Sequence, residues 1–158
     1  MNEMELAIDF EKSLGPWIGK TSKIVDYYFH EAFLQHGLDV SKEQMIVLKK
    51  LHNEDGLNQN ELAQLTWRDK SSLARLLAKM ERKGYIIRSQ HDLDKRVNLV
   101  YLTESGREIF RNTRPIIQNA IDIMEKDLSK ADIERMIEIL KRIQNNFTKE
   151  IASQQESK

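Results

Sequence analysis

The spacing of apolar residues in the first third of the chain predicts two amphipathic helices. From Trp17 to Phe33, apolar side chains recur mostly three and four residues apart, which places them on one face of an α-helix. This helix should stop near His36. A second helix should begin after Ser41, because Ser41 and Gln44 have the spacing of a capping box, which satisfies the first backbone N–H groups of a helix.

Two shorter helices are predicted next. Asn58 and Glu61 form a similar start signal, and Asp69 is a suitable N-cap for the helix after it. That helix should run to about Lys83 and end at Gly84, since glycine tolerates the backbone conformation of a helix end. Its apolar residues recur at helical spacing and predict one buried stripe: Leu73, Leu76, Leu77 and Met80.

The period of the pattern then changes. The segments YIIRS (85–89) and VNLVYL (97–102) are short and rich in β-branched and aromatic residues, as strands are. They flank a polar loop, Gln90 to Arg96, and we interpret them as a β-hairpin. The pattern does not decide which face of each strand is buried. Two short helices followed by a hairpin make a winged helix-turn-helix.

The last third is predicted to be helical. Thr103 should cap a helix in which Pro115 forces a kink or a break, because proline lacks a backbone N–H and clashes with the preceding turn. Ser129 and Asp132 should begin the final helix. An apolar stripe follows along it: Ile133, Met136, Ile137, Leu140, Ile143 and Phe147. Residues 153–158 should form a frayed tail.

The composition limits the class of protein. The chain has 158 residues, of which 40% are hydrophobic and 32% charged, and this suits one folded domain rather than disorder. The absence of cysteine excludes disulfides, cysteine-ligated zinc and thiol redox chemistry. The N-terminus is acidic, and no segment has the roughly 20 apolar residues that a membrane span needs, so we expect a cytoplasmic protein.

The distribution of charge changes this picture, although the formal net charge is zero. Residues 58–103 contain nine Lys or Arg residues and five Asp or Glu residues, whereas the rest of the chain carries more acids than bases. A basic middle between two acidic arms indicates a nucleic-acid partner for the middle segment.

The predicted fourth helix has a polar face that suits DNA. Ser72, Arg75, Lys79 and Arg82 lie opposite the leucine stripe. Long cations and hydroxyl groups near a helix N-terminus are groups that contact base edges and phosphates. On its own, this face is equally typical of a solvated surface helix. The charged hairpin that follows it favours the DNA interpretation.

The polar loop of the hairpin has the chemistry of a wing. A wing beside a duplex needs a cation at its tip, which is attracted by the negative potential of the minor groove, and an acid that holds the loop. Lys95 and Arg96 suit the first role and Asp94 the second. In an isolated hairpin, the same charges would more simply indicate a solvated turn.

The run DKRVNLVYLT, Asp94 to Thr103, resembles the wing signature of MarR-type transcription regulators, in which Asp, any residue and Arg are followed by five residues and Leu-Thr. The resemblance continues through LDVSKEQMIVLKKL, NQNELAQ, DKSSLARLLAKMERKGYIIR and LTESG. It covers Leu38 to Gly106 closely and the flanking helices by pattern, with several motifs in the family's order and spacing.

The resemblance implies a fold that is mainly α with a small β-hairpin wing, a winged helix-turn-helix lobe plus a helical dimerisation region. Residues 1–37 would form an N-terminal dimerisation helix, 38–103 the DNA-binding lobe and 104–152 the C-terminal dimerisation helices. The implied function is a ligand-responsive repressor that binds a pseudo-palindromic DNA operator as a homodimer. An alternative is a winged-helix module that binds protein without binding DNA, and another is a metal-responsive regulator.

Individual residues follow from the match and from the charge pattern. Ser71, Ser72, Arg75 and Lys79 fall at recognition-helix positions and Arg96 at the wing tip. The full set that we expect to contact DNA is Arg68, Lys70, Ser71, Ser72, Arg75, Lys79, Arg88, His91, Lys95 and Arg96, with Asp94 structuring the wing. Where many family members have a small residue in the turn between the two short helices, this chain has Trp67, which would be exposed on the DNA side or would plug the lobe.

Other kinds of site are less well supported. Trp17, Tyr27, Tyr28 and Phe33 could line a pocket for a small aromatic or anionic effector, although core packing explains them equally well. The segment HDLD, His91 to Asp94, has metal-ligand residue types, but a zinc site usually needs three or four convergent ligands. No nucleophile elbow, Gly-rich loop or carboxylate pair indicates an enzyme, and we expect neither a cofactor nor a metal.

Overall fold

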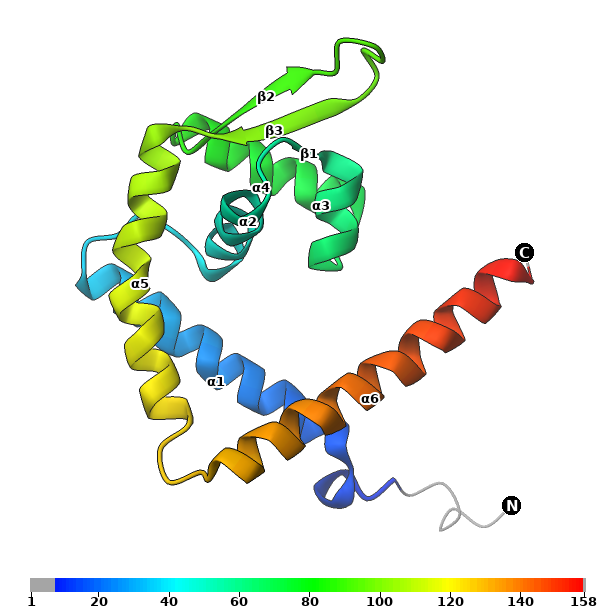
Figure 1. The fold of residues 1–158 in the computed structure, drawn as a ribbon. Coiled ribbons are helices and arrows are strands. Elements are labelled where there is room, and N and C mark those ends of the chain that lie inside the picture. The colour runs from blue at the N-terminus through cyan, green and yellow to red at the C-terminus, as the bar shows by residue number, and fades with distance from the viewer. Residues whose placement is uncertain (1–7, 158) are drawn as a thin grey trace. The chain divides into compact units, whose positions relative to one another are not determined.

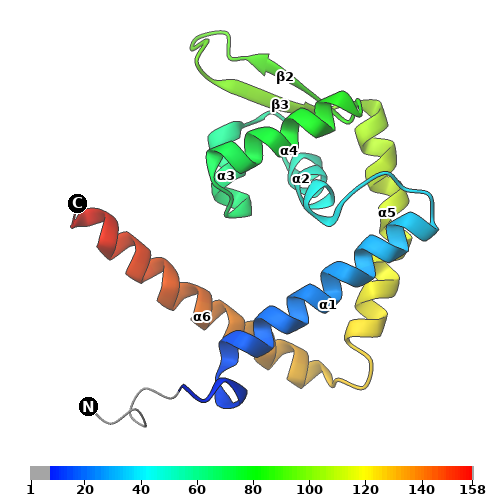
Figure 2. The same cartoon turned by 180° about the vertical axis from the view of Figure 1, so that it is seen from behind.

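The computed structural model describes residues 8–157 and divides into two compact units, one ending at Gln118 and the other beginning at Asn119. Figure 1 shows the ribbon and Figure 2 the same ribbon from behind. The elements in chain order are the 3₁₀ turn η2 (Phe10–Lys12), α1 (Leu14–Gln35), α2 (Lys42–Asn53), β1 (Leu57–Asn58), α3 (Gln59–Thr66), α4 (Lys70–Arg82), β2 (Ile86–Gln90), β3 (Asn98–Leu102), α5 (Glu104–Met124) and α6 (Lys130–Glu156). Residues 1–7 of the predicted N-terminal region and Lys158 of the predicted tail lie outside the described residues.

The helix starts that the sequence predicts are confirmed by capping bonds. Capping boxes are present at Ser41 and Gln44, at Asn58 and Glu61, and at Ser129 and Asp132. Two further caps use single side chains. Asp69 Oδ1 accepts a hydrogen bond from the Ser72 backbone N–H at 2.8 Å, and Thr103 Oγ1 accepts one from the Gly106 N–H at 3.0 Å. Each bond satisfies a backbone donor that a helix start leaves without a partner.

The predicted hairpin is confirmed and belongs to a three-stranded antiparallel sheet. β2 pairs with β3 from Ile86 opposite Leu102 to Gln90 opposite Asn98. β1 adds two residues to the other edge of β3, a pairing that the sequence analysis did not predict. Burial decides the open question of strand parity, because Ile86, Val100 and Leu102 are buried whereas Ile87 is exposed.

One apolar core joins the helices of the lobe to its sheet. The apolar side chains that are almost fully buried come from α1, α2, α3, α4, β2 and β3, and they include Phe33, Leu48, Leu51, Leu62, Leu73, Leu77, Met80, Ile86 and Val100. The predicted stripe of α4 is confirmed at Leu73, Leu77 and Met80, whereas Leu76 is half-buried at the edge. A common core of this kind holds α4 and the hairpin in fixed positions relative to each other.

Two predictions for the C-terminal part are corrected in part. α5 is continuous through Pro115, so the helix does not break there, and the alternative effect of this proline, a kink, stays a prediction. Arg111 and Pro115 are both exposed, so water can hydrogen-bond the Arg111 carbonyl that proline leaves without a donor. The frayed tail expected from residue 153 is also wrong as far as Glu156, where α6 ends, because the helical hydrogen bonds continue to that point.

α6 has no buried residue along its 27 positions, although it carries the predicted apolar stripe.

No helix between residues 8 and 157 combines the length and the apolar character needed to cross a membrane.

Candidate nucleic-acid interface

The outer face of α4 carries cations that project away from the core. Arg75 and Lys79 are exposed and form no ion pair within the part of the chain that the structure describes. They lie opposite Leu73, Leu77 and Met80 because residues three and four apart share one side of a helix. The predicted orientation of Arg75 and Lys79 is therefore confirmed. These side chains have the reach and the donors to contact an anionic polymer.

Arg68 and Ser72 are paired with each other at the start of α4. Arg68 Nη1 donates to Ser72 Oγ at 2.8 Å, and the Ser72 backbone N–H is bonded to Asp69. Ser72 is consequently half-buried, whereas its neighbour Ser71 is exposed. Arg68 also lines a surface depression of about 590 Å³ together with Lys79, so it lies on the same basic side of the lobe.

The wing loop is held by Asp94, as the sequence predicts. Asp94 Oδ1 accepts from the backbone N–H and the Nε–H of Arg96, both at 3.1 Å, and Oδ2 accepts from Arg96 Nη2 at 3.3 Å. These hydrogen bonds from the Arg96 side chain and backbone lower the pKa of Asp94. The Arg96 side chain is still 91% exposed, so it can meet a partner outside the wing.

His91 also stabilises the wing loop, through hydrogen bonds to the loop backbone. Its Nδ1 accepts hydrogen bonds from the backbone N–H groups of Leu93, at 3.1 Å, and Asp94, at 3.3 Å. Leu93, which the sequence analysis did not single out, stands 93% exposed at the wing tip. An apolar residue in a polar loop was the available signal for it.

A depression between α4 and the wing brings together residues that are distant in sequence. It measures about 380 Å³, and Lys70, Ser71 and Arg96 line it together with Asn60 and other residues. The structure therefore joins the predicted recognition-helix and wing residues on one surface. Asn60, at the start of α3, was missed because an exposed asparagine beside a capping residue gives no signal in the sequence.

Arg88 differs from the other predicted DNA-contacting residues. Its Nε and Nη2 donate to the Glu81 carboxylate at 3.3 and 3.1 Å, and its backbone N–H donates to the same group at 3.0 Å. The hydrogen bond from the Arg88 side chain is the main cause of a lowered pKa at Glu81. Arg88 thus links β2 to α4, and its charge is already paired inside the lobe.

The four residues predicted to line an effector pocket have different surroundings in the single chain, and their role in binding an effector stays a prediction. Phe33 is 1% exposed in the lobe core, and Tyr28 contacts Phe29 edge to face. Trp17 is half-exposed, with its indole N–H donating to the Glu11 carbonyl at 2.9 Å. Phe33 therefore lies on the buried side of α1, whereas Trp17 is exposed at its surface.

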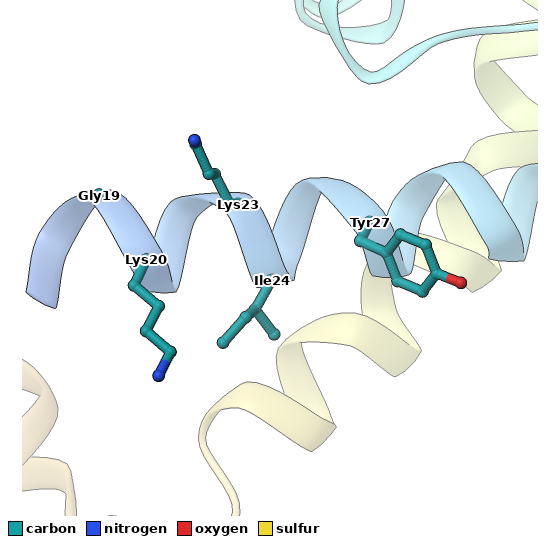
Figure 3. Close-up of a pocket in the computed structure, with 5 residues that line it drawn as sticks. All are labelled: Gly19, Lys20, Lys23, Ile24 and Tyr27. Carbon is teal, nitrogen blue, oxygen red and sulfur yellow. The ribbon is translucent and has the colours of Figure 1, made fainter.

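Tyr27, the fourth of them, borders a depression of about 550 Å³ on the outside of α1. All of its lining residues belong to this one helix, and Figure 3 shows Lys20 and Lys23 pointing to opposite sides. A depression on a single helix does not surround a ligand as binding pockets do. Between residues 8 and 157 there is also no group of three or more side chains able to hold a metal ion, and this includes the HDLD segment.

Trp67 ends α3 in the turn before α4. Its backbone has a φ of 54°, in the left-handed region, and its side chain is 73% exposed. Of the two arrangements that the sequence left open, Trp67 does not plug the lobe.

Comparison with known proteins identifies the family of this chain. The sequence pattern that defines the MarR family matches residues 40–97, which contain α2, α3, α4 and most of the wing. The transcriptional regulator HosA of Escherichia coli O157:H7 is 31% identical over 118 residues, which cover 73% of this chain and 87% of HosA. The chain belongs to the MarR family.

Solved structures agree with the family assignment in their fold. A MepR–DNA complex from S. aureus superposes with a TM-score of 0.78 at 24% identity, covering 85% of this chain and 98% of MepR. The PcaV regulator of Streptomyces coelicolor, solved with its natural ligand, superposes with a TM-score of 0.76 at 20% identity, covering 88% and 96%. The predicted winged helix-turn-helix fold is confirmed.

Membership of the MarR family makes this chain a DNA-binding transcription regulator, and the family is one of regulators rather than enzymes. The shared segment, residues 40–97, includes α4 and the wing loop, the two elements whose cations face outward.

Proposed function

We propose that this MarR-family regulator is a repressor that binds a pseudo-palindromic operator as a homodimer and is released by a small effector. The observation that carries the DNA-binding part is the surface shared by α4 and the wing, where Lys70, Ser71 and Arg96 line one depression. A continuous basic surface with hydroxyl donors at a helix start suits the phosphate backbone and the base edges of a duplex.

We assign different contacts to the two elements. Arg75 or Lys79 reaches base edges in the major groove, because both project from the outer face of α4. Arg96 and Lys95 lie in or beside the minor groove, with Asp94 fixing the loop. The remaining contacts to phosphates involve Arg68, Lys70, Ser71, Ser72 and His91. Arg88 supports the wing through Glu81 instead of binding DNA.

The homodimer is supported by apolar surface that a monomer leaves open. On α6, Met136, Ile137 and Phe147 are exposed, and on α1, Ile18 and Ile24 are exposed. Exposed apolar surface of this extent is typical of an interface. We assign residues 1–37 and 104–152 to dimerisation and residues 38–103 to DNA binding. A two-fold dimer would present two lobes to two half-sites of an operator.

Release by an effector is supported by the relatives. PcaV was solved with its natural ligand, and regulation of DNA binding by 6-hydroxynicotinic acid is described for the structurally similar BpsR of Bordetella bronchiseptica. We extend to this chain a small aromatic or anionic effector, without assigning residues to its site.

A competition mobility-shift experiment tests the function. The labelled probe is the DNA upstream of the protein's own coding sequence, and the competitors are the same fragment and a scrambled duplex. The proposal predicts a shift that the upstream fragment competes away at least about a thousandfold better than the scrambled duplex. Equal competition would show DNA binding without sequence preference and would contradict the operator. No shift at low salt would contradict DNA binding itself and would favour a winged-helix module that binds protein.

A further inference from the structure

We infer that Trp67 is a DNA-backbone contact in which the indole ring packs on a sugar and its N–H donates to a phosphate oxygen. The inference deepens the proposed DNA-binding function and rests on it. Trp67 is a residue type that the backbone conformation at this position does not favour.

The turn between α3 and α4 requires a left-handed backbone at Trp67, with a φ of 54°. Glycine adopts this conformation without steric cost, whereas a side chain with a Cβ does not. The three other positive-φ positions between residues 37 and 103 have glycine, at Gly37, Gly56 and Gly84, and the other non-glycine residue with positive φ in the described chain is Asp127, in the turn after α5. Residues held in such conformations tend to be found at functional sites.

The ring of Trp67 also has no structural use inside the lobe. It is 73% exposed, and its indole N–H donates to no protein atom among residues 8–157. Trp17, the other tryptophan of the chain, donates its indole N–H to the Glu11 carbonyl. An exposed indole combines a large apolar face with one donor, a combination suited to an interface with a polar edge.

The position of Trp67 selects duplex DNA as the partner. Trp67 and Lys70 line one surface depression of about 600 Å³, which also includes Asn60 and Arg68. Lys70 and Asn60 in turn line the depression that contains Ser71 and Arg96. Trp67 is therefore continuous with the proposed DNA surface and lies beside Arg68 and Lys70, which attract phosphate groups. Asp69, the one acid in the same depression, is bonded as the N-cap of α4.

Variants at this position separate binding from folding. Trp67→Gly should leave the unfolding midpoint unchanged or higher, because glycine suits the backbone. It should weaken binding to duplexes of arbitrary sequence by about tenfold, the scale of one lost hydrogen bond to a charged group. Two different sequences should lose the same factor, since backbone contacts carry no sequence information. The salt dependence should not change, because an indole has no charge, whereas Lys70→Met should flatten it.

Fluorescence tests the contact directly. In Trp17→Phe, Trp67 is the only tryptophan, and we expect a short duplex of arbitrary sequence, at saturation and low salt, to change its emission and protect it from acrylamide. In Trp67→Phe, the emission of Trp17 should not respond. DNA binding that leaves the emission and the acrylamide quenching of Trp67 unchanged would overturn this inference alone. Failure of the parent protein to bind any duplex would overturn the inference together with the proposed function.

Discussion

Arg88 and Arg96 carry the same charge on the same hairpin, but their surroundings give them different tasks. Arg88 is 27% exposed and is bonded to Glu81 of α4, whereas Arg96 is 91% exposed and is bonded within its own loop. The sequence predicts a basic hairpin, but it does not show which cation is already paired, because Glu81 lies seven residues before Arg88 on another element. Residue-level predictions therefore depend on the structure.

Alanine substitutions at these two arginines should therefore have different effects. Arg96→Ala should weaken binding to operator and scrambled DNA alike and should lower the salt slope by about one phosphate equivalent per subunit. Arg88→Ala should instead lower the free energy of unfolding and leave the salt slope unchanged. Salt titrations of DNA binding, paired with denaturant unfolding, measure both effects. If the parent protein and Arg96→Ala have the same salt slope, the prediction that the wing contacts DNA phosphates is wrong.

Arg75 should act through sequence preference. Arg75→Ala should cost about 1 to 3 kcal/mol of operator binding and relax the preference at one position in each half-site, because a base-edge contact is lost. Binding to a set of single-base operator variants measures this, with Arg142→Ala, at an exposed position of α6, as the control that should keep the preference. If Arg75→Ala weakens all variants equally, Arg75 binds phosphate and does not read bases.

The wing loop should respond to pH through Asp94. The pKa of this carboxyl is lowered in the folded protein, so its pairing with Arg96 stabilises the loop above the ordinary value of 3.8. The pairing should be lost as the pH falls through the lower folded value. The NMR shift of the Arg96 backbone amide should follow this titration with a midpoint below 3.8. A midpoint at or above that value would show that the pair does not form in solution.

At the scale of elements, the helix starts could be predicted from the sequence because a few neighbouring residues specify each of them. Capping residues such as Ser41 and Asp69 fix helix starts through bonds three residues away, so the sequence contains both partners. β1 was missed because two residues, Leu57 and Asn58, make no periodic pattern and form a strand only by pairing with β3. Of the kink or break expected at Pro115, the break was wrong, because the sequence does not show that Arg111 and Pro115 lie on the exposed face of α5.

The junction of α5 with the wing allows a prediction about packing. A Cβ added at Gly106 would lie 2.0 Å from the Tyr85 carbonyl oxygen, so the backbone would have to shift. Gly106→Ala should lower the free energy of unfolding by about 1 to 3 kcal/mol. Ser105→Ala, at the exposed neighbouring position, should change it by less than about 0.5 kcal/mol. Denaturant titration compares the two, and equal stability would show that α5 starts differently.

At the scale of the whole molecule, the proposed operator binding requires a second copy of the chain. Ile137→Glu together with Leu140→Glu should abolish the dimer and, with it, operator binding, because two charges would be buried in an apolar interface. Arg142→Glu changes the net charge by the same amount on the exposed opposite side of α6 and should remain dimeric. Sedimentation at micromolar concentration gives the masses. A monomeric parent protein would contradict the prediction.

Footprinting of the bound upstream DNA tests the central claim, a dimer that reads DNA with α4 and the wing, most directly. The account predicts two protected half-sites related by two-fold symmetry, with centres about 10 base pairs or a multiple of that distance apart. Minor-groove protection should flank each half-site and disappear in Arg96→Ala. A single unsymmetrical protected segment, or uniform weak protection along the fragment, would contradict the account.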